Sequence, residues 1–163
     1  MKKETYIVAT IRPWNIKAFY NIINKYPGDW HLISSKEDLN IQKLKTLKPR
    51  YIFFPHWSEK VPKNIINTFE CVCFHETDLP YGRGGSPIQN LIILGHTKTV
   101  ITALKMNEEF DSGPIYLKES LSLEGLAEEI YNRASIVVAE MIKTIITNNP
   151  KHKKQVGKPV IFK

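Results

Sequence analysis

Short apolar segments alternate with segments of helical periodicity along the first half of this 163-residue chain. Runs rich in β-branched and aromatic residues predict strands, whereas apolar residues that recur every three or four positions predict helices. The regular alternation of the two predicts an α/β fold with a mostly parallel, twisted sheet and helices on both of its faces. The predicted strands are 5–11, 30–34, 51–54 and 71–74, and the predicted helices between them are 16–23, 39–47 and 61–69.

The second half of the chain predicts a less regular set of elements. A helix is expected at 88–94, a strand at 99–106 and a short strand at 115–117. From 123 to 145 the apolar residues step by three or four, which predicts one long amphipathic C-terminal helix with Ser122 as its N-cap. A final edge strand is expected at 160–162. No internal repeat or linker separates these elements, so residues 1–163 are expected to form one domain.

The charge balance favours an anionic partner. The formal net charge is +7 and the sequence pI is about 9.3, which suits phosphate groups or nucleotides. The basic residues are scattered, so a nucleic-acid-binding module is not expected. No apolar run approaches the ~20 residues of a membrane helix, and the N-terminal residues do not resemble a signal peptide. Cys71 and Cys73 are poorly placed to bond to each other, so a reducing, cytoplasmic location is expected.

A loop rich in glycine and proline follows the fourth predicted strand. It begins at His75, carries Arg83 between glycines and ends at the helix predicted for 88–94. Open α/β sheets bind ligands at the carboxyl ends of their strands, so His75 is expected in a binding site. The chain lacks the Gly-x-Gly-x-x-Gly and P-loop signatures of nucleotide binding, and no Cys/His spacing predicts a metal. The generic motifs therefore leave the function open.

Two motifs in this region give the chain a family resemblance. The first is His75-x-x-x-Leu79-Pro80-x-x-Arg83-Gly84-x-x-Pro87-Ile88, and the second is Phe110-Asp111-Ser112-Gly113-Pro114-Ile115. With 36 positions from His75 to Asp111, the chain resembles the 10-formyltetrahydrofolate-dependent formyltransferases over nearly its whole length. This family includes the catalytic domains of methionyl-tRNA formyltransferases. The motifs look closest to those of the small nucleotide-sugar N-formyltransferases.

The resemblance implies a Rossmann-like formyltransferase fold and an N-formyltransferase activity, with His75 and Asp111 as catalytic residues. The co-substrate would be 10-formyltetrahydrofolate, and no metal would be required. A histidine with a pKa of about 6.5 can take a proton from an attacking amine and return it to the leaving nitrogen. A carboxylate beside it would orient the ring and favour its protonated form.

The chain departs from the family at one catalytic position, where Cys73 stands in place of an asparagine. A thiol is a weak hydrogen-bond donor and does not replace an amide in an oxyanion hole. We expect a relocated donor to serve instead, with Asn90, Asn107 or a backbone N–H as the candidates. The alternative is a slow or inactive enzyme.

Two groups of binding residues are expected, one from the resemblance and one from its place at the carboxyl edge of the sheet. Aromatic residues suit the flat pterin ring of folate, and basic residues at the end of the first strand suit a diphosphate. Arg83 could equally stabilise its own loop by a salt bridge, and Asn15 could cap the helix that follows it. The residues expected on the cofactor side are Phe54, Pro55, His56, Trp57, Arg83, Gly84, Asn107 and Glu108, and those on the acceptor side are Arg12, Trp14, Asn15, Lys17 and Tyr81.

The acceptor expected from the resemblance is a small molecule, a nucleotide-linked amino sugar, with neither a nucleic acid nor a membrane as partner. The tRNA enzymes carry a further C-terminal domain, and the sequence stops near Phe162, at a segment that often continues in relatives. Two alternatives remain open. One is formylation of glycinamide ribonucleotide or of a carrier-bound aminoacyl group, and the other is a degenerate domain that binds folate or nucleotide without catalysis. The sequence predicts no oligomeric state.

Overall fold

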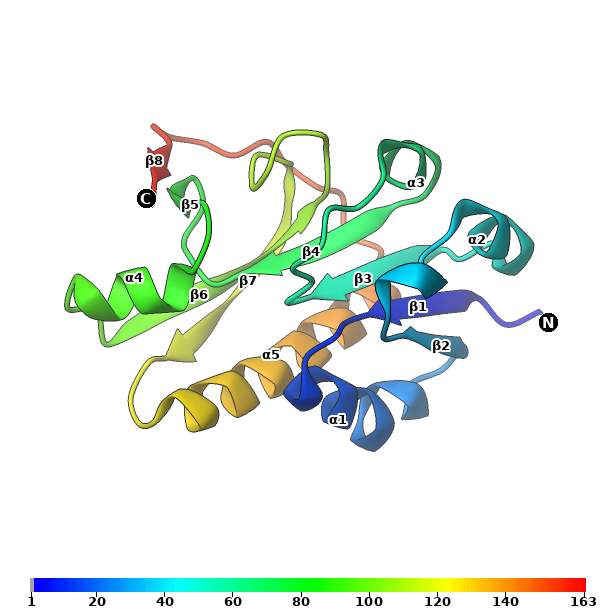
Figure 1. The fold of residues 1–163 in the computed structure, drawn as a ribbon, viewed down its shortest axis with the longest axis horizontal. Helices are drawn as coiled ribbons and strands as arrows, with labels where there is room; N and C mark the ends of the chain where they lie inside the picture. The colour runs from blue at the N-terminus through cyan, green and yellow to red at the C-terminus, as the bar shows by residue number, and fades with distance from the viewer. Residues whose placement is uncertain (1) are drawn as a thin grey trace.

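A six-stranded sheet with the strand order β2-β1-β3-β4-β6-β7 forms the centre of the molecule (Figure 1). The computed structural model describes residues 2–163. Strands β2, β1, β3 and β4 run parallel, whereas β6 and β7 are antiparallel to their neighbours. The predicted α/β fold with a mostly parallel sheet is confirmed. The strands are β1 (Thr5–Ala9), β2 (Asp29–Ile33), β3 (Tyr51–Pro55), β4 (Cys71–His75), β5 (Tyr81–Arg83), β6 (Lys98–Lys105), β7 (Ile115–Ser122) and β8 (Val160–Ile161). The α-helices are α1 (Pro13–Asn21), α2 (Ile41–Leu47), α3 (Lys63–Thr68), α4 (Pro87–Ile93) and α5 (Ala127–Asn148).

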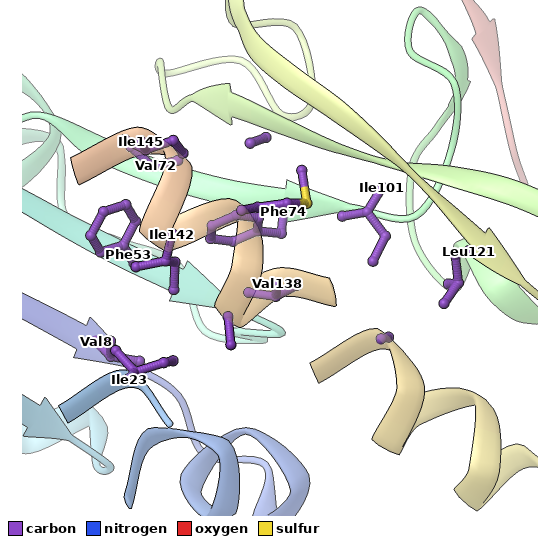
Figure 2. Packing of buried hydrophobic residues seen from close by; sticks show 14 of the residues in the cluster. Val8, Ile23, Phe53, Val72, Phe74, Ile101, Leu121, Val138, Ile142 and Ile145 are labelled. Carbon is purple, nitrogen blue, oxygen red and sulfur yellow. The ribbon is translucent and has the colours of Figure 1, made fainter. Parts of the chain in front are cut away.

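Helices cover both faces of the sheet because successive residues of a strand point to opposite sides. Phe53 and Val72 belong to the core that includes residues of α1 and α5, whereas Ile52 belongs to the core beneath α2 and α3. Figure 2 shows Phe53 and Val72 near Ile142 and Ile145 of α5. All of these side chains are fully buried, and each contributes about 1.5–3 kcal/mol to folding.

The boundary between β7 and α5 differs from the sequence prediction. β7 continues from the predicted end at 117 to Ser122, because it pairs with β6 as far as Lys98. Its outer residues are polar and exposed, as suits an edge strand, and this polarity hid the strand from the sequence pattern. The prediction that Ser122 caps the long helix is wrong. α5 begins only at Ala127, and the side chain of Glu129 accepts a hydrogen bond from the backbone N–H of Leu126.

The C-terminal segment returns across the molecule to the loop after β4. The predicted final strand is present as β8, but it pairs in parallel with β5 in a separate two-stranded sheet. Before it, Lys153 and Ile115 exchange two backbone hydrogen bonds of 2.7 and 2.9 Å. Residues 150–163 therefore lie against both loops that carry the sequence motifs (Figure 1).

The parallel order brings several loops to one edge of the sheet. β1, β3 and β4 lie side by side and end there with the residues that precede α1, with His56 and with His75. The carboxyl edge of an open α/β sheet is the usual place for a ligand. Within residues 2–163, no helix is long and apolar enough to span a bilayer.

Candidate active site

A cavity of about 760 Å³ lies at the carboxyl edge of the sheet. Its walls come from the residues that follow β1, β3 and β4, from the glycine-rich loop 84–86 and from the loop 106–111. Tyr131 of α5 completes one side. A volume of this size is typical of a site for a small organic ligand.

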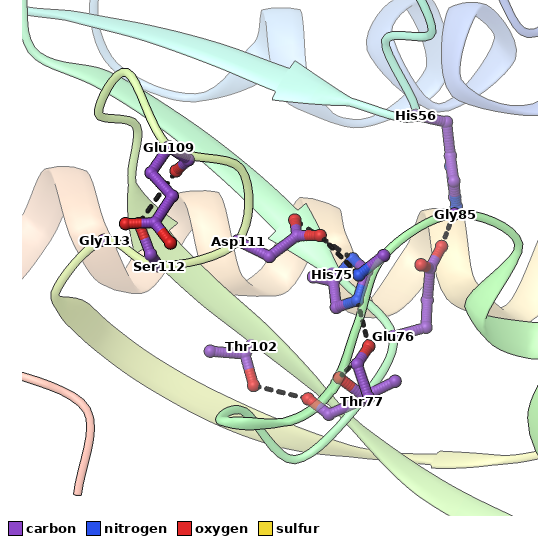
Figure 3. A network of polar contacts seen from close by, with 12 residues as sticks. His56, His75, Glu76, Thr77, Gly85, Thr102, Glu109, Asp111, Ser112 and Gly113 are labelled. Carbon is purple, nitrogen blue, oxygen red and sulfur yellow. Dashed lines mark hydrogen bonds and ion pairs between the residues drawn. The ribbon is translucent and has the colours of Figure 1, made fainter. Parts of the chain in front are cut away.

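His75 and Asp111 face each other in this cavity, with 3.5 Å between His75 Nδ1 and Asp111 Oδ1 (Figure 3). His75 is only 8% exposed. Its Nε2 lies 2.7 Å from the backbone oxygen of Gly82, and because a carbonyl can only accept, Nε2 carries the hydrogen. Nδ1 is therefore the nitrogen that can exchange a proton with a ligand. A proton taken up there would be stabilised by the Asp111 carboxylate.

The position of Asp111 is fixed by a hydrogen bond to its carboxylate and by the conformation of its loop. Its Oδ2 accepts a hydrogen bond from the backbone N–H of Gly84 at 2.9 Å. Its backbone has a φ of +57°, in the left-handed region that few side chains occupy. At Gly113 an added Cβ would lie 1.7 Å from the backbone oxygen of Lys105, so only glycine fits there. The glycine of the Asp-x-Gly motif is thus required by the local packing.

Gln155 joins the two motif loops and was not predicted from the sequence. Its Nε2 donates to the backbone oxygens of Asp111 at 2.8 Å and Gly113 at 2.9 Å. Its Oε1 accepts a hydrogen bond of 2.8 Å from Arg83 Nη2. Gln155 follows Lys153 and Lys154 in a polar segment, and no local pattern distinguishes it from a solvent-exposed residue.

A second polar pair, Glu76 and His56, lies on the other side of His75 from Asp111 (Figure 3). Glu76 Oε1 is hydrogen-bonded to His56 Nε2. Glu76 is only 4% exposed, and burial by itself would raise the pKa of its carboxyl group. The contact with His56 outweighs burial and lowers the pKa of Glu76, with a further contribution from His75. Glu76 is therefore ionised at neutral pH, and the sequence prediction did not include it.

Cys73 also lines the cavity. Burial raises the pKa of its thiol, and the nearby Asp111 adds to this effect, so the thiol stays protonated. Among the candidate replacement donors, Asn90 does not line the cavity, and its amide donates to the backbone oxygens of Gly85 and Ser86. Asn107 does line the cavity, and its Oδ1 accepts a hydrogen bond of 2.9 Å from Ser112. Asn107 therefore remains a candidate, together with backbone N–H groups.

The family assignment follows from comparison with known proteins. The model of the family described as "Formyl transferase" matches residues 20–146, which is most of the chain. The chain belongs to the formyl transferase family. The domain is 35% identical, over 127 residues, to the methionyl-tRNA formyltransferase of Thermodesulfovibrio yellowstonii, an alignment that covers 71% of this chain and 41% of that protein. The chain spans about two fifths of the length of the curated relatives it matches.

Two solved structures share the fold of this formyl transferase domain. Methionyl-tRNA formyltransferase from Clostridium thermocellum has a TM-score of 0.91 and 44% identity, covering 98% of this chain and 71% of that one. HypX from Aquifex aeolicus, solved in complex with tetrahydrofolic acid, has a TM-score of 0.77 at 16% identity, covering 96% of this chain and 29% of that one. These similarities confirm the formyltransferase fold expected from the two motifs.

The residues expected on the cofactor side of this formyl transferase divide into two groups. Trp57 packs edge-to-face on Phe54, with ring centroids 5.9 Å apart, and its buried indole N–H has no hydrogen-bond partner among residues 2–163. Arg83 does not line the cavity, and its guanidinium donates a hydrogen bond to the neutral side chain of Gln155 rather than forming a salt bridge within residues 2–163. Pro55 also lies outside the lining, whereas Phe54, His56, Trp57, Gly84, Asn107 and Glu108 belong to it.

The residues expected on the acceptor side divide in the same way. Arg12 and Trp14 line the cavity, and Trp14 stacks on Tyr131, with ring centroids 4.7 Å apart. Asn15 is buried behind the cavity and does not cap α1, because its Nδ2 donates to the backbone oxygen of Pro55 and lies 2.8 Å from His56 Nδ1. Lys17 and Tyr81 do not line the cavity, and the Tyr81 hydroxyl is bonded to His96 instead.

Among residues 2–163, no group of three or more His, Cys, Asp or Glu side chains is arranged so that it could hold a metal ion.

Proposed function

We propose that this protein transfers the formyl group of 10-formyltetrahydrofolate to a primary amine. The observation that carries the proposal is the His75 Nδ1–Asp111 pair, which faces a 760 Å³ cavity in a chain of the formyl transferase family. On this proposal, residues 1–163 act as one catalytic domain. The folate is a co-substrate, and the chemistry calls for one group that both accepts and donates a proton.

His75 is proposed as that group. Its Nδ1 takes one proton from the amine as the amine nitrogen bonds to the formyl carbon, and it returns this proton to N10 of the folate as the carbon–nitrogen bond to the folate breaks. The acceptor nitrogen thus gains the formyl group and loses one proton, whereas N10 loses the formyl group and gains that proton. Asp111 stabilises the protonated imidazole between the two steps, and Gly82 fixes the ring through Nε2.

We propose that the pterin ring binds between the aromatic residues after β3 and the loop 107–111. Phe54 and Trp57 supply an apolar wall, and the unpaired indole N–H of Trp57 can donate to a ring nitrogen or oxygen. Asn107 and Glu108 lie in the lining on the opposite loop. Tetrahydrofolic acid bound to HypX, which has the same fold, supports a folate site in this architecture.

For the acceptor, we propose a nucleotide-linked amino sugar. The support comes from Arg12, whose guanidinium can bind a diphosphate, and from the stacked Trp14 and Tyr131 beside it. Methionyl-tRNA is the second candidate, because the relatives at 35% and 44% identity are methionyl-tRNA formyltransferases. A nucleic-acid partner, which the sequence prediction excluded, is therefore part of the test.

The test is an assay of formyl transfer from 10-formyltetrahydrofolate. The reaction is monitored by the formation of tetrahydrofolate and by mass spectrometry of the acceptor. A panel of nucleoside diphosphate amino sugars is compared with methionyl-tRNA. Formylation of one of these acceptors supports the proposal and selects between them. Tight folate binding without transfer to any amine would contradict it and would favour a non-catalytic folate-binding domain.

A further inference from the structure

The pair formed by His56 and Glu76 is a buried charged group that formyl transfer by His75 and Asp111 does not use. Glu76 follows His75 directly in the chain, and both line the cavity. Figure 3 shows the pair on the side of the His75 ring away from Asp111. The side chains of His56 and Glu76 are 15% and 6% exposed. A carboxylate with so little contact to water is unfavourable unless something in the cavity compensates its charge.

The hydrogen bonds around His56 fix both the ring and its tautomer. Trp14 Nε1 donates to His56 Nδ1 at 3.3 Å, and Asn15 Nδ2 lies 2.8 Å from the same nitrogen. Asn15 also donates to the backbone oxygen of Pro55, which determines which end of its amide faces the ring. Because Nδ1 receives two donors, it holds no proton, and Nε2 carries the hydrogen that binds Glu76.

His56 therefore orients Glu76 through one hydrogen bond from Nε2 to Oε1, and the carboxylate in turn outweighs burial and raises the pKa of His56. No Lys or Arg forms an ion pair with Glu76 among residues 2–163, although Arg12 lines the same cavity. Oε2 is bonded to no other side chain in the described part of the molecule. The cavity therefore contains a fixed carboxylate next to His75 whose only ionic partner among residues 2–163 is His56.

We infer that Glu76 binds the ammonium group of the acceptor, and that His56, Asn15 and Trp14 are positioning residues that hold its carboxylate in place. This inference rests on the proposed formyl transfer and names the part of the site that recognises the amine. Glu76 forms no covalent bond in the reaction. The bound ammonium releases one proton to solvent before it attacks, and the second proton passes through His75 to the folate nitrogen.

The inference is consistent with either acceptor. Both a nucleotide-linked amino sugar and an aminoacyl ester present a primary ammonium group. The analogue of the sugar with a hydroxyl in place of the amine lacks this group, and so does the desamino analogue of the ester. A site built around a buried ionic acceptor rejects an analogue without the matching donor, because the carboxylate is then left unpaired. Losing one charged hydrogen bond of this kind changes the Kd by about 10-fold to 100-fold.

The experiment measures ligand binding by calorimetry at pH 7 with saturating tetrahydrofolate, so that no reaction occurs. Two matched pairs of probes are used: uridine diphosphate-glucosamine with uridine diphosphate-glucose, and methionine methyl ester with its desamino analogue. Wild-type protein is expected to bind the amine of at least one pair about 10-fold to 100-fold more tightly than its partner. Glu76→Gln, which keeps the shape but removes the charge, is expected to abolish this preference.

Two further variants separate recognition from folding. Glu119→Gln removes an exposed carboxylate of β7 that does not line the cavity, and it should leave the preference unchanged. His56→Gln retains an N–H donor and should retain most of the preference, whereas His56→Ala should lose it. Tetrahydrofolate affinity and the melting temperature verify that each variant is folded. If Glu76→Gln unfolds, Glu76→Asp replaces it. Glu76→Asp keeps the charge and is expected to retain a reduced preference for the amine.

The inference would be overturned if the wild type bound the amine and its amine-free counterpart equally in both probe pairs. It would also be overturned if Glu76→Gln kept the full preference for the amine. Complete loss of the preference in Glu76→Asp, with normal folate binding, would overturn it as well. These outcomes are distinct from failure of the proposed function. Formyl transfer with an unaffected Glu76→Gln variant would reject only the ammonium site. An amine preference without formyl transfer would reject only the catalytic activity.

Discussion

Replacing Gln155 with alanine tests whether the C-terminal segment holds the catalytic loops in place. The side chain of Gln155 forms hydrogen bonds to the backbones of Asp111 and Gly113 and to the guanidinium of Arg83. The two neutral bonds are worth about 0.5–1.5 kcal/mol each, and the bond to the half-buried Arg83 is worth about 1 kcal/mol after allowance for its exposure. Gln155→Ala is therefore expected to destabilise the Asp111 loop locally by about 2–4 kcal/mol.

The effect on catalysis is limited by the same energy. If all of it were lost from the transition state, kcat would fall by about 30-fold to 1000-fold, because about 1.4 kcal/mol corresponds to a factor of ten. The bond between Gly84 N–H and Asp111 Oδ2 remains in the variant and retains part of the loop geometry. We therefore expect kcat to fall by about 10-fold to 100-fold, with a smaller change in KM for the folate.

Two measurements check this expectation independently. Formyl-transfer kinetics give kcat and KM, and amide hydrogen exchange reports the opening of residues 107–115 without requiring an acceptor. Gln42→Ala, on the exposed side of α2, is the control for loss of a glutamine side chain. Unchanged kcat together with unchanged exchange in 107–115 would show that Gln155 does not hold the loop, and the reasoning would be refuted.

Three further predictions concern the site and the core. His75→Ala should abolish formyl transfer and Asp111→Ala should reduce it severely, while calorimetry shows folate affinity within a few-fold of wild type; near-normal turnover in the His75 variant would exclude it as the base. Cys73→Asn should leave kcat unchanged or reduced, because a relocated donor serves and the larger amide must fit beside packed side chains; a gain approaching about 100-fold would show that the wild-type site lacks a donor. Hydrogen bonds from Tyr116 and Arg50 outweigh burial and lower the pKa of Glu70, so its stabilising effect is full above its unfolded pKa and is lost as the pH falls through its folded pKa. The difference in melting temperature between wild type and Glu70→Gln should therefore be constant above about pH 5 and shrink as the pH falls below about 4; a difference that is the same at every pH would contradict this assignment.

The family resemblance implies His75 and Asp111 as the catalytic pair, and the structure places His75 Nδ1 and Asp111 Oδ1 3.5 Å apart. Their roles in catalysis remain predictions. Which of the expected binding residues line the cavity was decided by the tertiary structure, because a loop sequence does not tell which side chains point into a cavity. Arg83, Tyr81 and Lys17 lie outside the lining, whereas Tyr131, from a helix with no recognisable motif, lies within it.

The sequence by itself determined the alternation of strands and helices, the long C-terminal helix and the two motif loops. These features depend on local periodicity and turn chemistry, which a short window of residues contains. It also determined the chemical types available at the strand ends, including a histidine after β3 and another at the end of β4.

Only the tertiary structure decided how the polar residues are paired. Gln155 reaches Asp111 across 44 positions of sequence, and Glu76 reaches His56 across 20. Such contacts depend on the order of the strands in the sheet and on the return of the C-terminal segment across β5, neither of which leaves a periodic pattern in the chain. For the same reason, no sequence pattern predicts that Glu76 is ionised and buried beside His75, since that depends on which neighbours the fold supplies.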